Sequence, residues 1–342
     1  MKPERIKYNI LNILFSVFAL VFTCSFIVPD PVPFNYNSIY YPYYPFFSSQ
    51  SITYAPEFSL TSDSVVIPLK RAGRLFLIEA KVDDQIGNLV FDTGANGLVL
   101  NSTYFRNHLK SGGSIANGIT GPVGLVEQIS IGKLEFAEIT YKNIKADVTN
   151  LGHIENRRGF KILGLLGFSM MRNLEIVIDA KNNELILTRI DKTGKRVNNT
   201  NPEFKADYLQ KFETTTNILF LKGKIAGKNL NFCFDTGAET NAISSDSNKN
   251  ILNSLTITRR STLKGVGSAR SEVLFGRMND FSIGERQITE METIISNLDA
   301  LSEAYETRIN GILGYNFLEQ GTICINFVKK QFGIRFTNKG EK

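Results

Sequence analysis

Two copies of one short motif contain the residue types that could do chemistry in this chain. The first copy reads Phe-Asp-Thr-Gly-Ala at residues 91–95, and the second repeats these five residues at 234–238. A carboxyl group can act as a general base when ionised and as a general acid when protonated. Two carboxyls that share one proton could do both, because repulsion between close carboxylates keeps one of them protonated. Asp92 and Asp235 are therefore the first candidates for an acid–base site.

The remaining composition argues against other kinds of site. The chain has two histidines, His108 and His153, and three cysteines, none in the spacing of C-x-x-C or H-E-x-x-H. We therefore expect no metal, no cofactor and no Ser/His or Cys/His nucleophile. The net charge of +6 comes from 39 basic and 33 acidic residues scattered along the chain. Because no basic run is interleaved with aromatic residues, nucleic acid is not an expected partner.

The motif lies inside a longer internal repeat. Residues 76–100 read FLIEAKVDDQIGNLVFDTGANGLVL, and residues 219–244 read LFLKGKIAGKNLNFCFDTGAETNAIS. The two segments align without a gap before the motif, and Asp235 follows Asp92 by 143 residues. Alternating apolar and polar residues around the turns DDQIGN and AGKN are typical of strands. Each half is therefore predicted to form a β-hairpin that runs into its DTGA sequence.

A second landmark also occurs twice. Residues 164–171 read GLLGFSMM and residues 311–318 read GILGYNFL, with an offset of 147 residues. Each G-x-L-G element leads into a segment predicted to form a further strand pair. An offset close to that of the DTGA motifs makes the repeat a domain-sized unit, far longer than the repeats of solenoids.

An apolar strand ending in D-T-G-A, a Gly-rich hairpin and an apolar-apolar-Gly element together resemble the retropepsin-like and pepsin-like aspartic peptidases. The resemblance is strongest to exported bacterial members, and it covers Val65 to Phe336. It implies an all-β, bilobal, pseudo-two-fold aspartic-protease fold with two retropepsin-like β-barrel lobes. It also implies an aspartic endopeptidase, with Asp92 and Asp235 as the dyad that activates water. The expected partner is a peptide or protein substrate, and the expected state is a monomer with two lobes.

Two alternatives stay open at this point. One is a catalytically inactive, peptide-binding member of the same fold. The other is that each lobe pairs with another chain.

The resemblance also assigns roles to the residues around the dyad. The supporting residues that it implies are Thr93, Gly94, Ala95, Thr236, Gly237 and Ala238. The threonines would cross-link the two loops, and the glycines would let backbone amides approach the carboxylates. The G-x-L-G elements would support the loops from below, with Leu166 and Leu313 in the core. The Gly-rich stretches at 117–124 and 263–270 would be flaps that close over substrate.

The chain departs from the pepsin-like pattern in two respects. Pepsin-like enzymes usually have Ser or Thr after DTG, whose hydroxyl donates to the dyad, whereas this chain has Ala95 and Ala238. Loss of donors to the ionised form should raise the apparent pKa values of the dyad. We therefore expect a pH optimum less acidic than that of stomach pepsin. The first flap candidate also lacks the tyrosine that pepsin-like flaps place over the site.

The cysteines Cys233 and Cys324 align with apolar residues of the other half, Val90 and Val177. Core thiols are therefore expected at both positions. A disulfide within the second lobe is the alternative, because the chain is expected outside the cytoplasm.

The first 64 residues predict export and attachment rather than a folded lobe. Residues 1–28 carry three basic residues and then an uncharged apolar run, which is typical of a signal peptide or a membrane anchor. Acylation at Cys24, as in a bacterial lipoprotein, is an alternative. Residues 29–64 are rich in Pro, Tyr and Phe and are predicted to be a tether, or else an aromatic surface that docks elsewhere or folds over the cleft.

The expected domains are therefore the N-terminal segment 1–28, the tether 29–64, an N-terminal lobe 65–195 and a C-terminal lobe 196–342. The expected location is periplasmic or at the cell surface, with contact to the membrane through the N-terminal segment.

Overall fold

A computed structural model describes residues 13–14, 57–108, 110–118, 121–198, 202–215, 218–264 and 270–337. The predicted signal peptide or anchor, apart from residues 13–14, and residues 29–56 of the predicted tether lie outside these residues. Cys24 also lies outside them. In the described part of the chain, no helix is both long enough and apolar enough to cross a bilayer.

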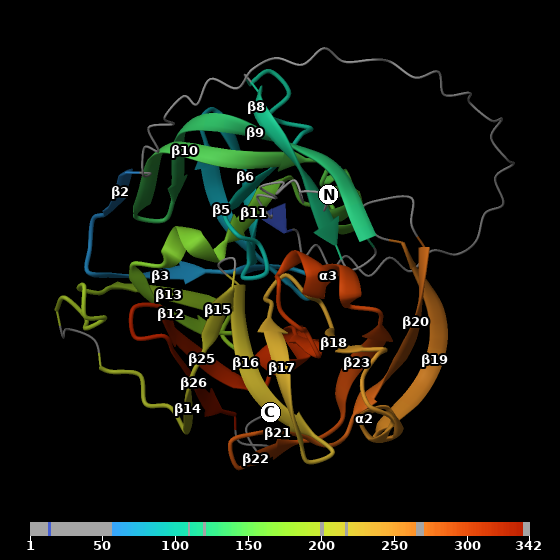
Figure 1. The fold of residues 1–342 in the computed structure, drawn as a ribbon. Helices are drawn as coiled ribbons and strands as arrows, with labels where there is room; N and C mark the ends of the chain where they lie inside the picture. The colour runs from blue at the N-terminus through green and yellow to red at the C-terminus, as the bar shows by residue number, and fades with distance from the viewer. Residues whose placement is uncertain are drawn as a thin grey trace, which may run out of the picture.

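The N-terminal lobe is built on a ten-stranded sheet (Figure 1). Its strands are β1 (Ile13–Leu14), β2 (Glu57–Leu60), β4 (Lys70–Ala72), β5 (Leu75–Val82), β6 (Gln85–Asp92), β7 (Leu98–Asn101), β8 (Lys110–Gly118), β9 (Gly121–Phe136), β10 (Ile139–Thr149) and β11 (Ile162–Gly167). Helix α1 (Gly152–Arg158) precedes β11, and the short 3-10 helix η1 (Phe168–Met171) follows it. An additional pairing of β9 with β5 curls the sheet back on itself.

The C-terminal lobe is built on a second ten-stranded sheet. Its strands are β15 (Glu213–Thr215), β16 (Ile218–Ile225), β17 (Lys228–Phe234), β18 (Asn241–Ser244), β19 (Leu255–Lys264), β20 (Arg270–Met278), β21 (Phe281–Ile283), β22 (Arg286–Ile288), β23 (Met291–Ser296) and β24 (Gly311–Leu313). Its helices are α2 (Lys249–Asn253), α3 (Asp299–Ala304) and α4 (Tyr315–Leu318).

A six-stranded sheet joins the two halves of the chain. It contains β3 (Ser64–Pro68), β12 (Leu174–Asp179), β13 (Glu184–Arg189), β14 (Tyr208–Lys211), β25 (Gly321–Asn326) and β26 (Gln331–Phe336). At its centre β12 and β25 pair antiparallel, with Val177 opposite Cys324. These two strands are the equivalent segments of the repeat, so the pseudo-two-fold axis passes between them.

The strand pairings show the same symmetry inside the two lobes. In the N-terminal lobe β11 pairs parallel with β6 and antiparallel with β7, and β7 pairs parallel with β10. In the C-terminal lobe β24 has the same relations with β17 and β18, and β18 pairs parallel with β23. The predicted all-β, bilobal, pseudo-two-fold fold is confirmed, with short helices added between strands.

The strands that lead into DTGA are buried on both faces. The last five residues of β6 and the last three of β17 are all buried. Phe91 packs into the large core that spans both lobes, and Val90 points into a smaller apolar cluster of its own lobe. A strand covered on both faces needs a continuous apolar run, as these sequences have. The hairpins are also as predicted, because Ala226 and Gly227 both have positive φ angles in the turn between β16 and β17.

Three features differ from the expectation. Ile13–Leu14, within the predicted N-terminal segment 1–28, forms β1 and pairs parallel with β8. Glu57–Leu60, which the sequence places in the tether, forms β2 and pairs with β10. The Phe58 ring packs there against Tyr141, tilted by 44° with ring centroids 5.0 Å apart, and this contact helps to hold the segment on the lobe. The cysteines Cys233 and Cys324 are both free, so the alternative of a disulfide between them is wrong.

The carboxyl of Asp147 on β10 provides a test of the fold that is independent of the motifs. Burial raises its pKa from 3.8 to about 6, and a hydrogen bond from Gln128 lowers it only in part. A folded-state pKa above the unfolded value stabilises the fold at acidic pH, and this contribution is lost as pH rises through about 6. Asp147→Asn should therefore stabilise the chain at pH 7.5 by up to about 3 kcal/mol.

Urea unfolding of wild type and Asp147→Asn at several pH values measures this effect. The difference should shrink as the pH falls toward the unfolded-state pKa. Asp246→Asn, at an exposed position, is the matched control and should change stability little. Equal stability of wild type and Asp147→Asn at pH 7.5 would contradict the prediction.

Candidate active site

The two Phe-Asp-Thr-Gly-Ala segments meet at the boundary between the lobes. Strand β6 ends at Asp92, and Asp235 follows directly after β17. The side chains of both aspartates are almost fully removed from solvent, with exposed fractions of 1% and 0%. Residues that are distant in sequence therefore form one buried region with two carboxyl groups.

The threonines of the two motifs hold this region together through four hydrogen bonds between the lobes. The Thr93 amide donates to Thr236 Oγ1 at 3.0 Å, and the Thr236 amide donates to Thr93 Oγ1 at 2.9 Å. The two hydroxyls then donate to the carbonyl oxygens of Phe234 and Phe91, at 2.9 Å and 2.7 Å. The arrangement is reciprocal, so each loop fixes the backbone of the other. The structure thus places both threonines where the sequence predicts a cross-link.

The glycines of the motifs donate backbone hydrogen bonds to the carboxylates, and their lack of a side chain allows a close approach. The Gly94 amide donates to Asp92 Oδ1, and the Gly237 amide donates to Asp235 Oδ1, both at 2.8 Å. Gly237 also lies directly against the other carboxyl, since a Cβ at this position would come within 2.5 Å of Asp92 Cγ. Only glycine permits this approach without a clash. The Asp92 carboxyl is therefore seated against the loop that carries Asp235.

The alanines that follow are buried below the carboxyls. Ala95 and Ala238 are both 0% exposed and present only methyl groups. Their carbonyl oxygens accept hydrogen bonds from the amides of Phe168 and Tyr315, at 3.2 Å and 2.9 Å. Each loop is thereby tied to the segment that follows its G-x-L-G element.

The second glycine of each G-x-L-G element lies against the carbonyl oxygen of a motif alanine. A Cβ at Gly167 would lie 2.5 Å from the Ala95 carbonyl oxygen, and one at Gly314 would lie 2.5 Å from that of Ala238. The intervening Leu166 and Leu313 are fully buried in the core. The elements therefore pack directly beneath the two loops, which is the position that the resemblance implies.

Tyr305 is a buried neighbour of the two aspartates, and no sequence motif marks it. It follows helix α3, and its hydroxyl donates to the Gly94 carbonyl oxygen of the other lobe at 3.4 Å. Burial raises its pKa well above the usual value, and the thiol of Cys233 and the charges of Asp235 and Asp92 raise it further. Tyr305 is therefore a neutral hydrogen-bond donor. The repeat offset of 147 residues relates it to Arg158, which is the only sequence signal that could have drawn attention to it.

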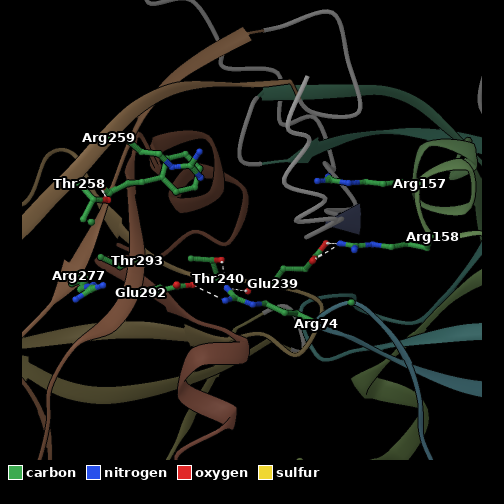
Figure 2. Close-up of a pocket in the computed structure, with 13 residues that line it drawn as sticks. Arg74, Arg157, Arg158, Glu239, Thr240, Thr258, Arg259, Arg277, Glu292 and Thr293 are labelled. Carbon is green, nitrogen blue, oxygen red and sulfur yellow. Dashed lines mark hydrogen bonds and ion pairs between the residues drawn. The ribbon is translucent and has the colours of Figure 1, made fainter. Parts of the chain in front are cut away.

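Arg158 makes the corresponding contact from the N-terminal lobe. At the end of α1, its guanidinium pairs with the carboxylate of Glu239, the residue that follows the second DTGA (Figure 2). Arg74 crosses the same boundary, donating to the Glu239 carbonyl oxygen at 3.2 Å and pairing with Glu292 at 2.6 Å. The ends of both equivalent helices therefore contact the DTGA loop of the opposite lobe.

Long hairpins lead into both predicted flaps. Strands β8 and β9 pair antiparallel around 117–124, and β19 and β20 pair antiparallel around 263–270. Residues 119–120 and 265–269 lie outside the described residues, so the flap function stays a prediction. Helix α3 of the C-terminal lobe lies against β8 of the N-terminal lobe, as Figure 1 also shows.

Comparisons with known proteins identify related sequences and folds. Residues 221–317, which include the second DTGA, match the model of a family described as aspartyl protease. The chain is similar in structure to a retropepsin-like aspartic protease from Rickettsia conorii, with 19% identity and a TM-score of 0.27 over 40% of this chain and 96% of that one. It is also similar to an aspartic proteinase from Irpex lacteus, with 12% identity and a TM-score of 0.48 over 80% and 98% of the two chains. Basic 7S globulin from soybean is similar with 10% identity and a TM-score of 0.43, over 81% and 95%.

No curated protein matches the chain in sequence. The family model nevertheless supports the resemblance to aspartic peptidases that the two motifs predict.

Proposed function

We propose that this chain is an aspartic endopeptidase in which Asp92 and Asp235 form the catalytic dyad. The observation that carries the proposal is the set of four reciprocal hydrogen bonds between Thr93 and Thr236 and the backbone of the opposite loop. These bonds hold two Asp-Thr-Gly loops face to face in one chain. Gly237, against which the Asp92 carboxyl lies, supports the same conclusion.

The proposed reaction needs one carboxylate and one carboxylic acid. The ionised aspartate takes a proton from a water molecule as the water oxygen attacks the peptide carbonyl carbon, while its protonated partner gives a proton to the carbonyl oxygen. The resulting gem-diol intermediate then collapses. The C–N bond breaks, the amine nitrogen receives a proton, and the dyad returns to its singly protonated state.

The fold suggests how substrate would be held. An extended peptide lying between the lobes can add its backbone hydrogen bonds to strand edges while alternate side chains enter pockets. In this proposal the hairpins β8–β9 and β19–β20 would cover such a peptide. We propose a monomeric enzyme with a peptide or protein substrate, exported and attached to the membrane through its N-terminal segment.

A transition-state analogue provides the most direct test. Wild-type protein should cleave members of a diverse peptide library, and a statine-type peptide should inhibit that cleavage because its hydroxyl mimics the tetrahedral intermediate. The matched control is the same peptide without this hydroxyl, which should bind at least about 100-fold more weakly. Equal inhibition by the two peptides, or the absence of any cleavage, would argue against the proposal.

The pH dependence of kcat/KM gives a second test. Ala95 and Ala238 supply no hydroxyl to the ionised dyad, so the maximum is expected at a pH less acidic than that of stomach pepsin. The profile should be bell-shaped, since one carboxyl must be ionised and the other protonated. Replacing both alanines by serine should shift the profile toward acidic pH, and a maximum that already lies in the strongly acidic range would contradict the prediction.

A further inference from the structure

A cavity of about 570 Å³ lies between the lobes beside the second DTGA loop (Figure 2). The N-terminal lobe contributes the turn between β4 and β5 and the end of α1, and the C-terminal lobe contributes β19, β20, β23 and the loop at Glu239. Its volume falls in the range of about 300–1,000 Å³ that is typical of small-ligand sites. The cavity can therefore accept a side chain together with part of a peptide backbone.

The lining of this cavity is strongly basic. Its arginines are Arg74, Arg157, Arg158, Arg259 and Arg277, and its two acidic residues are Glu239 and Glu292. Five arginines against two glutamates leave an excess of three positive charges in one concave region. Such an excess attracts anions, because a cleft walled by protein concentrates the field of its charges.

Both glutamates that line the cavity form ion pairs with arginines of the same cavity. Glu239 pairs with Arg158, and the exposed fractions of these side chains are only 9% and 19%. Glu292 pairs with Arg74, which also donates to Thr240 Oγ1 at 3.2 Å. These pairs join the two lobes at the cavity. Among the lining arginines, Arg157 and Arg277 take no part in these two pairs.

The remaining arginines are placed to meet a ligand. Arg157 points into the cavity beside the Arg158–Glu239 pair, and it makes no hydrogen bond or ion pair with any residue that the structure describes. Arg277 is 3.9 Å from Glu290, and both side chains are more than half exposed, so this pair is weak. Arg259 lies over the ring of Phe275 at 3.9 Å and adds positive charge to the same wall.

The position of the cavity links it to the dyad. Glu239 follows Asp235 by four residues on one continuous buried loop. A peptide that crosses the dyad in extended form advances about 3.3 Å per residue, and every second side chain points to the same wall. A side chain a few residues from the scissile bond would therefore reach the cavity. Guanidinium groups bind carboxylates through paired, charge-assisted hydrogen bonds.

We propose that this cavity binds an acidic side chain of the substrate, a few residues to one side of the scissile bond, so that the enzyme selects acidic peptide segments. The proposal rests on the proposed peptidase function and specifies the substrate class of the same site.

The test compares peptides that differ only by Glu or Gln at each position around a cleaved bond. Wild type should show a kcat/KM ratio of about 10 or more in favour of Glu at one position, because hydrogen bonds between charged groups are worth at least this factor. Added salt should lower the ratio, since the cavity is open to solvent. In Arg157→Gln/Arg277→Gln the ratio should fall to near 1, and Arg157→Glu should favour Lys over Glu at that position.

The matched control is Lys142→Gln/Arg189→Gln, which removes two positive charges at exposed positions of β10 and β13. This control should keep the wild-type ratio. A wild-type enzyme without an acidic preference at any position would overturn the proposal, and so would a preference that survives in Arg157→Gln/Arg277→Gln.

Measuring how tightly the Asp235→Asn protein binds the Glu and Gln peptides distinguishes a failure of the cavity assignment from a failure of the proposed peptidase function. Cleavage without any acidic preference rejects the cavity assignment and leaves the peptidase intact. Binding that favours Glu over Gln, with no cleavage by wild type, keeps the assignment and rejects the peptidase. A protein that neither cleaves nor binds the peptides rejects both.

Discussion

Replacing Asp235 with asparagine is expected to reduce kcat/KM for a cleaved peptide by about 10³-fold or more, with the fold retained. Asparagine has nearly the same shape, and its side-chain oxygen can still accept the hydrogen bond from the Gly237 amide. It can neither take a proton from water nor donate an acidic proton. The loss should therefore appear in catalysis rather than in folding.

The same substitution at Asp92 should have a similar effect. The two carboxyls act as one unit in the proposed reaction, so the double variant Asp92→Asn/Asp235→Asn should lose little more activity than either single variant. Asp246→Asn is the control, because it replaces an exposed aspartate outside the motifs. Activity is measured with a peptide taken from the library, and folding is checked by circular dichroism and urea unfolding.

Substantial activity in either single variant would remove the dyad from the mechanism. Losses that add fully in the double variant would show that the two aspartates act independently. A variant that binds peptide as tightly as wild type but does not cleave it would match the expected result.

Removing both hydroxyls between the lobes is expected to lower the free energy of unfolding by about 4 kcal/mol or more. In Thr93→Val/Thr236→Val the side chains keep their shape, but the amides of residues 93 and 236 lose their acceptors. The carbonyl groups of Phe91 and Phe234 lose their donors as well. Each buried polar group left without a partner costs about 1–3 kcal/mol, and the region offers no solvent to replace it.

The control for this prediction keeps the hydroxyl. Thr93→Ser/Thr236→Ser retains all four hydrogen bonds and loses only two methyl groups, so it should cost about half as much or less. Urea unfolding measures stability, and kcat/KM measures the effect on the dyad. The valine variant should lose activity as well, because the carboxyls follow directly on the backbone that these bonds position. A valine variant as stable and as active as wild type would show that the cross-link is dispensable.

The parts of the site that could be predicted are those whose sequence occurs in both halves of the chain. Both halves contain, in register, an aspartate, the threonine after it and a G-x-L-G element. In each half these residues form the loop and the segment that supports it. Gly167 and Gly314 illustrate this, since both lie against the carbonyl oxygen of a motif alanine. Repetition separates such residues from chance matches in a way that a single Asp-Thr-Gly could not.

The residues that could not be predicted are those at which the two halves differ. Arg158 and Tyr305 occupy equivalent places, yet one forms an ion pair with Glu239 and the other donates to a carbonyl oxygen. Both contacts cross between lobes, over 81 and 211 residues of chain. No periodicity or spacing in the sequence encodes a contact of this kind. The short helices that end at or just before these residues could not be predicted either, because helices of six or seven residues have too few turns for a visible period.

The sequence by itself determined that this chain has two equivalent β-rich halves, each ending a buried strand in Asp-Thr-Gly-Ala, and that its candidate chemistry uses paired carboxyls. Local patterns suffice for these conclusions, because hydrophobic alternation and turn residues act over a few positions. Only the tertiary structure decided that the threonines form hydrogen bonds across the lobes, that Tyr305 contacts the first Asp-Thr-Gly loop and that five arginines line one cavity. These arrangements depend on how two folded lobes pack, and packing brings together side chains that the sequence keeps far apart.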